Sequence, residues 1–436
     1  MSGRRVVITG VSAISAAGLG APALMDALCA GRSATRRVSA FDPSGFACQV
    51  GGEITDFSAR DFVPKSYRKA VKVMARDIEL AVAAADLAMR DAGLITKGID
   101  ETKVNIDGAR FACNIGAGLI CADLNELGAA IQTALTDGKF DLRKWGSEGM
   151  TNLTPLWLLK YLPNMLACHV TIIHDLRGPS NTLTCNQASG HLSVGEAWHQ
   201  IDRGAAELAI AGGAESKLNP MGLLRQGLTG RLANKYNDQP GQACRPFDVG
   251  HDGSVIGEGG GLLILEELET AKNRGARIYA ELVGFGGAND PAAVDAFAPH
   301  CGNVLQAGQK ALAQAGITGK QLSLVLPHGS GVAREDCSEA AALRTLLDGA
   351  SVPVAPIMGA VGDCHAGSGG LSLAMAAMAI GRQTIPRAVN FTAPAPGCEG
   401  LNIPTAARQA NVEYVLSQAF SSMGQSAAIV LKRYEA

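Results

Sequence analysis

The chain has 436 residues, of which 47% are hydrophobic and 18% charged, and this composition excludes a disordered or fibrous protein. The 38 Lys and Arg residues against 40 Asp and Glu residues leave a formal net charge of −2, which excludes a global attraction to nucleic acid or an anionic membrane. The 11 cysteines form no CxxC pair and predict free thiols in a reducing, cytoplasmic compartment.

The N-terminus gives no sign of a targeting segment. Its short apolar run ends in Thr9-Gly10, which is too early for a secretory signal. No apolar run in the chain reaches the roughly 18 residues of a membrane helix. We therefore expect a cytoplasmic protein with neither a membrane nor a nucleic-acid partner.

Short β-branched or apolar runs alternate with longer stretches of helical periodicity. Strands are predicted at 5–10, 111–118, 208–214, 261–266 and 324–326, and helices at 22–30, 78–92, 123–137, 193–203 and 304–316. Gly93 directly follows the second of these helices and is a plausible C-cap. This alternation predicts an α/β fold with helices on both faces of buried sheets.

A weak internal repeat divides the chain. The helix ending Asp91-Ala92-Gly93 precedes a strand that ends at Gly116, and the helix ending at Gly316 precedes the strand at 324–326, about half the chain later. Two similar α/β halves explain this pattern, although chance similarity between alanine-rich helices is the alternative. No proline-rich or charged linker separates the halves, so we expect one compact unit.

Three segments together carry a family resemblance. Residues 178–190 read GPSNTLTCNQASG, residues 245–248 read RPFD before a Gly-Glu-Gly at 257–259, and residues 328–331 read HGSG before Asp336 and Glu339. Their order and spacing resemble the β-ketoacyl-ACP synthases, the condensing enzymes of the thiolase fold. The glycine run at 257–261 precedes a strand rather than a helix, which argues against a nucleotide-binding loop.

The resemblance implies a definite architecture. It predicts a thiolase-like α/β fold with two pseudo-repeated halves in a layered αβαβα arrangement. Residues 1–260 would form the N-terminal half, with the nucleophile turn and the dimer side, and residues 261–436 the C-terminal half.

Several positions depart from the family pattern. The nucleophilic cysteine is replaced by Gln187, and the second histidine by Asp363, whereas the first histidine is retained as His328. A family lysine becomes Met358, and the aromatic residue and one glycine of the C-terminal loop become Ser422 and Met423.

A glutamine at the nucleophile position removes the condensing chemistry, because a carboxamide cannot attack a thioester. Gln187 has two donors and an acceptor and could occupy the oxyanion hole. It would then satisfy buried amides that cost about 1–3 kcal/mol each when unpaired.

Two nearby residues are candidates for auxiliary chemistry. Cys185 lies two residues before Gln187 and is a possible replacement nucleophile, but it falls short of the helix N-terminus, and a small buried thiol is the ordinary interpretation. His365 lies two residues beyond Asp363, which would aim its side chain elsewhere. Residues 363–365 lack the second ligand cluster of a metal site, so no metal or cofactor is expected.

The resemblance favours a non-catalytic role. Glutamine at this turn is similar to that of chain-length factors, the subunits that pair with an active ketosynthase in type II polyketide synthases and shape the shared tunnel. The implied partners are a ketosynthase subunit, in a heterodimer, and an acyl carrier protein. Asn164 and Met165 are tunnel or interface candidates, with ordinary dimer packing as the alternative.

Two enzymatic alternatives remain open. Glutamine-type loading ketosynthases decarboxylate malonyl-ACP, and His328 with His365 could serve that reaction, although a carboxylate at Asp363 would repel both the malonyl group and the enolate. A condensing enzyme that uses Cys185 is the other alternative.

Overall fold

The structure is a computed structural model that describes residues 3–290 and 302–435. The longer strands are β1 Val6–Val11, β6 Phe111–Gly116, β9 Ser180–Leu183, β10 Leu208–Ser216, β11 Ile256–Glu267, β12 Ala280–Asn289, β13 Leu324–Leu326, β16 Tyr414–Phe420 and β17 Gln425–Lys432. The short strands are β2 Ile14–Ser15, β3 Gly18–Leu19, β4 Arg36–Arg37, β5 Val50–Gly52, β7 Leu135–Thr136, β8 Lys139–Phe140, β14 Thr384–Ile385 and β15 Arg408–Gln409.

The α-helices complete the set of elements. They are α1 Ala21–Ala30, α2 Arg76–Asp91, α3 Leu124–Thr133, α4 Leu142–Ser147, α5 Met165–His174, α6 Ser189–Asp202, α7 Pro220–Gly227, α8 Leu268–Asn273, α9 Gly302–Ala315, α10 Ala333–Leu347, α11 Met358–Val361 and α12 Ala366–Arg382.

The longer strands form one continuous path in the order β13-β16-β17-β12-β1-β11-β10-β6-β9, and β7-β8 and β14-β15 form two separate small sheets. Two halves repeat along it, because β6-β10-β11-β1 and β13-β16-β17-β12 each pair first in parallel and then twice antiparallel. The antiparallel pair β1–β12 joins them. In each half a helix, α2 or α9, precedes the first of these strands. The predicted repeat is therefore confirmed.

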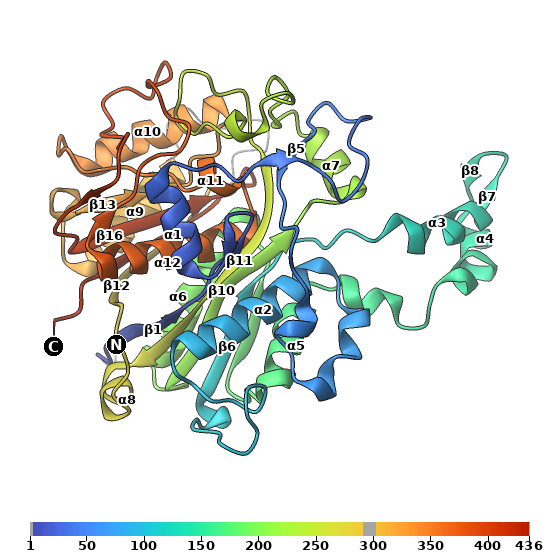
Figure 1. The fold of residues 1–436 in the computed structure, drawn as a ribbon, viewed down its shortest axis with the longest axis horizontal. Coiled ribbons are helices and arrows are strands. Elements are labelled where there is room, and N and C mark those ends of the chain that lie inside the picture. Colours follow the sequence, from blue (N-terminus) through green and yellow to red (C-terminus); the bar gives the residue numbers. More distant parts are fainter. Residues whose placement is uncertain (1–2, 291–301, 436) are drawn as a thin grey trace.

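The helices form layers on both sides of the strands (Figure 1). Helices α6 and α12 pack against each other and against strands of both halves, so they form the middle layer. Helix α2 covers the outer face of β10 and β11, and α9 covers that of β12 and β17. This is the predicted αβαβα arrangement. The proposed division of the chain after Gly260 stays a prediction; that residue lies inside β11.

Glycines allow the middle layer to approach the strands closely. A methyl group on Gly261 would lie 2.4 Å from the carbonyl carbon of Gly370 in α12, and one on Gly213 would lie 2.1 Å from the carbonyl oxygen of Ala366. A glycine run that looks like a loop in sequence is therefore a strand packed against a helix backbone. For this reason β11 begins at Ile256 rather than at the predicted Gly261.

Two helices differ from their predicted bounds. The predicted helix at 123–137 ends at Thr133, because Asp137 and Gly138, both at positive φ, form the turn of the β7–β8 hairpin. Helix α6 begins at Ser189 rather than Ser193, since the residues after the turn continue directly into the helix. The predicted C-cap is confirmed: Gly93 has a φ of +67° and donates to the carbonyl of Arg90.

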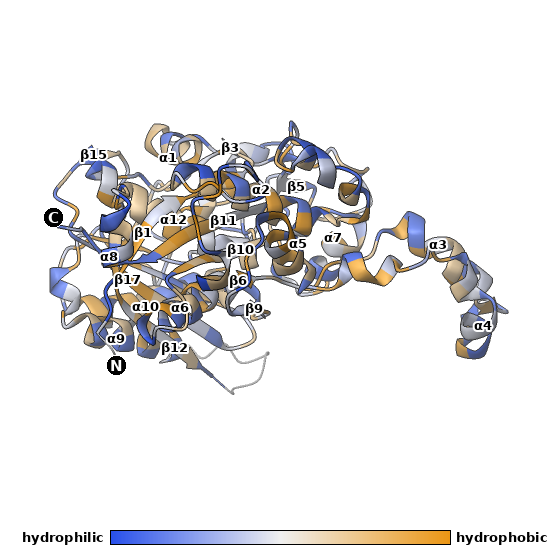
Figure 2. Ribbon diagram, turned by 90° about the horizontal axis from the view of Figure 1, so that it is seen from below, coloured by the Kyte–Doolittle hydropathy of each residue, from blue (hydrophilic) through white to orange (hydrophobic). Residues whose placement is uncertain are grey.

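An arm extends from the body between β6 and α5 and carries α3, β7, β8 and α4 (Figures 1 and 2). Glu126 fastens its base by accepting from Tyr161 Oη at 2.7 Å and pairing with Lys160. The arm and its two connections expose large apolar side chains, namely Leu119, Leu124, Phe140, Leu142, Met150, Leu156, Leu158 and Leu159.

No helix in the described part of the chain, including the arm, is long and apolar enough to cross a membrane.

Candidate functional site

Gln187 lies in the middle of a short 3₁₀ turn, Asn186–Ala188, that leads directly into α6. Asn186 adopts a φ of +49°, and its side chain donates to Ser421 Oγ at 3.2 Å. This strained residue turns the chain sharply at the helix N-terminus. The turn directs the Gln187 side chain inward, where it is only 2% exposed.

The side chain of Gln187 is bonded to the other altered position. Its Nε2 donates to Asp363 Oδ2 at 2.9 Å. Asp363 follows α11 and precedes α12, and is likewise only 2% exposed. The second carboxylate oxygen, Oδ1, accepts from His365 N at 2.8 Å and from Ser368 Oγ at 3.1 Å. Three donors therefore surround this carboxylate. The expected placement of Gln187 in an oxyanion hole stays a prediction.

Asp363 is held as an anion. Burial alone raises its pKa, but the adjacent His365, the Gln187 amide and the Arg231 guanidinium outweigh burial and hold the pKa well below its usual range. A buried, paired anion thus lies where the family pattern has a histidine.

His328 follows β13 and is 2% exposed. Its ring meets Phe420 edge to face, with centroids 4.6 Å apart. Within the described part of the chain neither ring nitrogen has a hydrogen-bond partner. Burial lowers the pKa of His328 despite the nearby Asp363, so its imidazole is neutral.

The motif around His328 holds its backbone rather than its ring. Glu339 in α10 accepts from His328 N and from Gly329 N, both at 2.8 Å. Asp336, one turn earlier, accepts from Gly331 N at 3.1 Å and from Phe247 N at 2.7 Å. Asp336 therefore joins the 328–331 segment to the RPFD segment, Glu339 holds the start of the 328–331 segment, and both segments retain a structural role.

His365 lies beside Asp363 rather than apart from it. Its φ of +49° folds the ring back, so that Nδ1 lies 3.2 Å from the carbonyl oxygen of Asp363. The expectation that its side chain is aimed elsewhere is therefore incomplete, because positive φ breaks the alternation assumed for extended chain. Cys364 between them is fully buried, and burial raises its thiol pKa. No group of three metal-binding side chains occurs among the described residues.

The remaining altered positions are inert. Met358 is 3% exposed and packs in a small apolar cluster with Val50 and Cys244. In the C-terminal loop Ser422 is half-buried and Met423 is 49% exposed. That these positions replace a family lysine and an aromatic side chain stays a prediction.

The surroundings of Cys185 do not favour the role of a replacement nucleophile. It precedes the 3₁₀ turn, and its backbone N–H donates to Ser189 Oγ at 2.7 Å. Burial raises the pKa of its thiol, which is the opposite of what an activated nucleophile needs.

Asn164 and Met165 lie where the arm returns to the body. Asn164 is exposed at the start of α5, and Met165 is half-buried against the apolar core beneath α2. The structure does not bring either residue to Gln187. Their assignment to a tunnel or an interface stays a prediction.

A cluster of buried charged residues lies next to the start of α12. Glu215 at the end of β10 accepts from Ala366 N at 2.9 Å and so holds the first residue of α12. Glu215 also pairs with Lys217, which is itself buried. Asp77 lies nearby in α2, where burial and Glu215 raise its pKa to about 7 against the opposing effect of Lys217.

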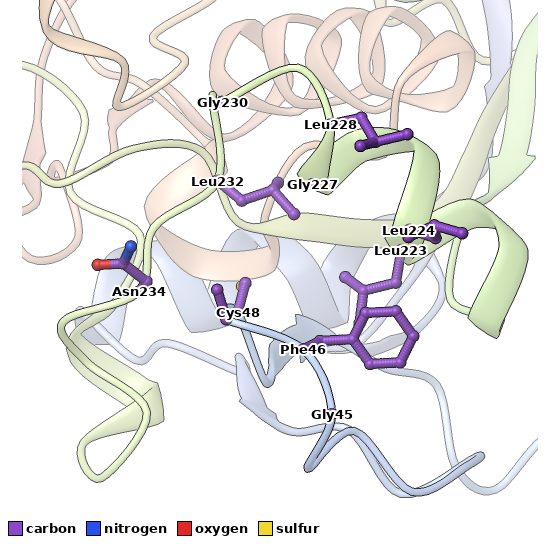
Figure 3. A pocket seen from close by; sticks show the side chains of 11 residues that line it. Gly45, Phe46, Cys48, Leu223, Leu224, Gly227, Leu228, Gly230, Leu232 and Asn234 are labelled. Atoms are coloured by element: carbon purple, nitrogen blue, oxygen red, sulfur yellow. The ribbon is translucent and has the colours of Figure 1, made fainter.

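An open cavity of about 310 Å³ lies elsewhere, between residues 45–48 and α7 with the loop that follows it (Figure 3). Its lining is largely apolar and includes Phe46, Leu223 and Leu228. None of the predicted site residues lines it. The cavity is therefore separate from the altered turn.

The sequence did not reveal which side chains bond one another. The Gln187–Asp363 bond and the contact of Glu215 to Ala366 N in α12 join residues more than a hundred positions apart in the chain. No local signal could have found them. By contrast, the roles of Asp336 and Glu339 follow the spacing of a motif visible in the sequence.

The layered fold and this altered turn define a ketosynthase scaffold of the thiolase-like class. The chain belongs to the β-ketoacyl synthase family: residues 3–271 match its N-terminal domain and residues 279–392 its C-terminal domain. A 3-oxoacyl-[acyl-carrier-protein] synthase 2 of Vibrio harveyi is 31% identical over 436 residues, which cover 99% of both chains.

Two solved structures resemble the whole chain. The ishigamide ketosynthase/chain length factor matches with a TM-score of 0.85 and 27% identity, covering 99% of this chain and 100% of that one. A beta-ketoacyl synthase from Burkholderia phymatum matches with a TM-score of 0.85 and 28% identity over the same shares. The family is thus established, and these comparisons support the thiolase-like fold.

Proposed function

We propose that this chain is a non-catalytic chain-length-factor subunit, which pairs with an active ketosynthase and shapes the tunnel that limits polyketide length. The observation that carries the proposal is the Gln187–Asp363 hydrogen bond. It joins a residue that cannot attack a thioester to an anion that cannot stabilise an enolate. Both groups are buried and paired with each other, so the site is stable without a substrate.

The surface supports a protein partner. One edge of β9 pairs with β6, and no other described strand pairs with the opposite edge, where Ser180 and Asn181 are exposed. An open edge offers N–H and C=O groups to a strand of a partner. The arm adds exposed apolar side chains, among them Leu142 at 73% and Leu156 at 76%. A partner that covers both features would remove this apolar surface from water.

A carrier protein is the second proposed partner. Lys65, Arg68, Lys69 and Lys72 are exposed along one short segment of two 3₁₀ turns. Such a basic group attracts an acidic protein even though the whole chain has a net charge of −2. We keep Asn164 and Met165 as tunnel or interface candidates in this assembly.

Malonyl-ACP decarboxylation is the second candidate. It is favoured by His328, whose neutral, buried ring has both nitrogens uncommitted within the described part of the chain. It is opposed by the Asp363 anion, which would repel the malonyl carboxylate. The chain-length-factor role accounts for both positions and is preferred.

The test uses the purified chain alone and together with the intact ketosynthase encoded nearest to it. We expect no acyl adduct on the isolated chain after incubation with acyl-ACP, and polyketide formation only by the co-purified pair. Elongation by the isolated chain would overturn the proposal. Release of carbon dioxide from malonyl-ACP by the isolated chain, lost in His328→Ala, would establish the decarboxylase instead.

A further inference from the structure

Two cysteines outside the altered turn lie close together. The Sγ atoms of Cys337 in α10 and Cys398 in the loop between β14 and β15 are 3.9 Å apart, although the residues are 61 positions apart in sequence. Cys337 is partly exposed, whereas Cys398 is fully buried. All ten cysteines in the described part of the chain are free thiols. We propose that Cys337 and Cys398 form a reversible disulfide site, oxidised by small-molecule disulfides or blocked by trivalent arsenicals.

The surrounding contacts hold the two thiols in register. Arg344, two turns after Cys337, donates from Nη1 to the carbonyls of Gly397 at 3.1 Å and Glu399 at 2.8 Å. The backbone N–H of Cys398 donates to the carbonyl of Ala395 at 2.9 Å, which closes the turn on the other side. The loop is therefore fixed against α10 by bonds independent of sulfur.

Gly397 gives the thiol of Cys337 room beside the loop. It has a φ of +87°, and a methyl group there would lie 3.0 Å from Cys337 Sγ. A disulfide bond is about 2.05 Å long, so its formation needs the two sulfur atoms to approach each other by about 2 Å.

The reaction proceeds by two exchanges. The thiolate of Cys337 attacks one sulfur of oxidised glutathione, which forms a mixed disulfide and releases one glutathione thiolate. The thiolate of Cys398 then attacks Cys337 Sγ, forms the internal disulfide and releases the second glutathione. The two cysteine protons pass through solvent to the two glutathione thiolates. The protein loses two electrons and oxidised glutathione gains them.

The order of attack follows from exposure. Cys337 is the accessible thiol, and it donates to the carbonyl of Pro396 at 3.0 Å. Burial, together with Asp336, Cys337 and Glu399, raises the pKa of Cys398. The second exchange is therefore the slow one, and it accelerates with rising pH.

Oxidation would affect the part of the protein that holds the 328–331 segment and Asp363. Cys337 directly follows Asp336 and precedes Glu339, the two carboxylates that hold the 328–331 segment. The disulfide would close a chain loop that contains Asp363 and α12. A long closed loop restricts the unfolded chain, so oxidation would stabilise this half of the protein.

The experiment treats the full chain with oxidised glutathione at pH 8 and measures intact mass, linked peptides and the melting temperature. We expect the loss of two hydrogens, a peptide linking Cys337 to Cys398, and a melting temperature raised by several degrees. Cys398→Ser should stop at one glutathione on Cys337, with no rise. Cys29→Ser, which removes another partly exposed thiol, should behave as the unmodified chain.

A second probe tests the pair in the unmodified chain, so that the result does not depend only on variants that fold correctly. Phenylarsine oxide binds two close thiols at once, so it should protect both cysteines of the unmodified chain from iodoacetamide and leave Cys398 unprotected in Cys337→Ser. Equal alkylation of Cys337 and Cys398 with and without either probe would overturn the proposal. A stable glutathione adduct on Cys337 of the unmodified chain, with no internal disulfide, would do so too.

Discussion

The amide nitrogen of Gln187 donates to the carboxylate of Asp363 at 2.9 Å, so the two positions that depart most from the condensing pattern are bonded to each other. Neither replacement is explained alone. An unpaired glutamine amide would leave buried donors unsatisfied, and an unpaired aspartate would leave a buried charge. Together they form a hydrogen-bonded pair, in which the neutral amide satisfies the buried carboxylate and the carboxylate satisfies the amide. The pair should therefore respond to substitution as one unit.

The first prediction concerns restoration of the nucleophile. Gln187→Cys alone should not be acylated by acyl-ACP, because the Asp363 anion disfavours a thiolate beside it. Gln187→Cys with Asp363→His should be acylated at least about tenfold faster, since a factor of ten needs only about 1.4 kcal/mol. Adduct formation is measured by mass spectrometry.

The background for that experiment is Cys185→Ala, so that only the new thiol is counted. Residue 358 stays methionine in both variants, so acylation rather than elongation is the readout. Equally fast acylation of the single and the double variant would show that Asp363 does not control this position.

The second prediction concerns stability. Gln187→Ala removes one of three donors from a buried carboxylate and should lower the free energy of unfolding by about 1–3 kcal/mol. Urea denaturation measures the change. Gln187→Ala combined with Asp363→Ala should lower the free energy of unfolding by less than the sum of the two single changes, because the double variant leaves no buried carboxylate without its donor. Strict additivity would contradict an energetic bond between the two.

The third prediction concerns pH. The pKa of Asp77 is raised to about 7 by burial and Glu215, against about 3.9 in an unfolded chain. Between these values the folded state binds one proton more than the unfolded state, so stability falls as pH rises from about 4 to about 7. We expect a loss of roughly 2–3 kcal/mol between pH 5 and pH 8 from this group.

Asp77→Asn should remove most of that loss, because an amide still accepts from Ser216 N at this position but does not titrate. Asp42→Asn is the control, since Asp42 is exposed and hydrogen bonds from Ser44 lower its pKa, out of the tested range. Urea unfolding at pH 5 and pH 8 compares the three chains. An unchanged pH dependence in Asp77→Asn would assign the slope to other groups.

Local patterns predicted the frame of this fold well. The strand at β1 and the closing glycine Gly93 follow from β-branching and cap chemistry, which act within a few residues. The glycine-rich start of β11 was missed, because its conformation depends on α12, a helix more than a hundred residues away in the chain. The Asp137-Gly138 hairpin was available in the sequence but was absorbed into a helix.

The candidate site divides in the same way. The identity of Gln187 and Asp363 was visible in the sequence, whereas their hydrogen bond was not, because it depends on how the turn before α6 faces the segment before α12. His365 shows the limit most clearly. Two residues of extended chain would direct it away, and a single positive φ returns it to Asp363.

The fourth prediction tests the arm as a partner surface. Leu156 is 76% exposed on the return path of the arm, and an aspartate there adds a charge without removing a buried contact. Leu156→Asp should leave the melting temperature of the isolated chain within about one degree, since exposed substitutions change stability by less than about 0.5 kcal/mol. It should reduce co-purification with the ketosynthase at least about tenfold, because a charge buried at an interface costs several kcal/mol.

Leu228→Asp is the matched control, because Leu228 is 80% exposed but lies after α7, beside the cavity of Figure 3. Co-purification on an affinity tag and size-exclusion chromatography of the pair give the readout. A loss of pairing in Leu156→Asp but not in Leu228→Asp assigns the partner to the arm. Equal recovery of the ketosynthase with both variants would exclude Leu156 from the interface, and equal loss with both would mean that added charge, rather than the arm, governs assembly.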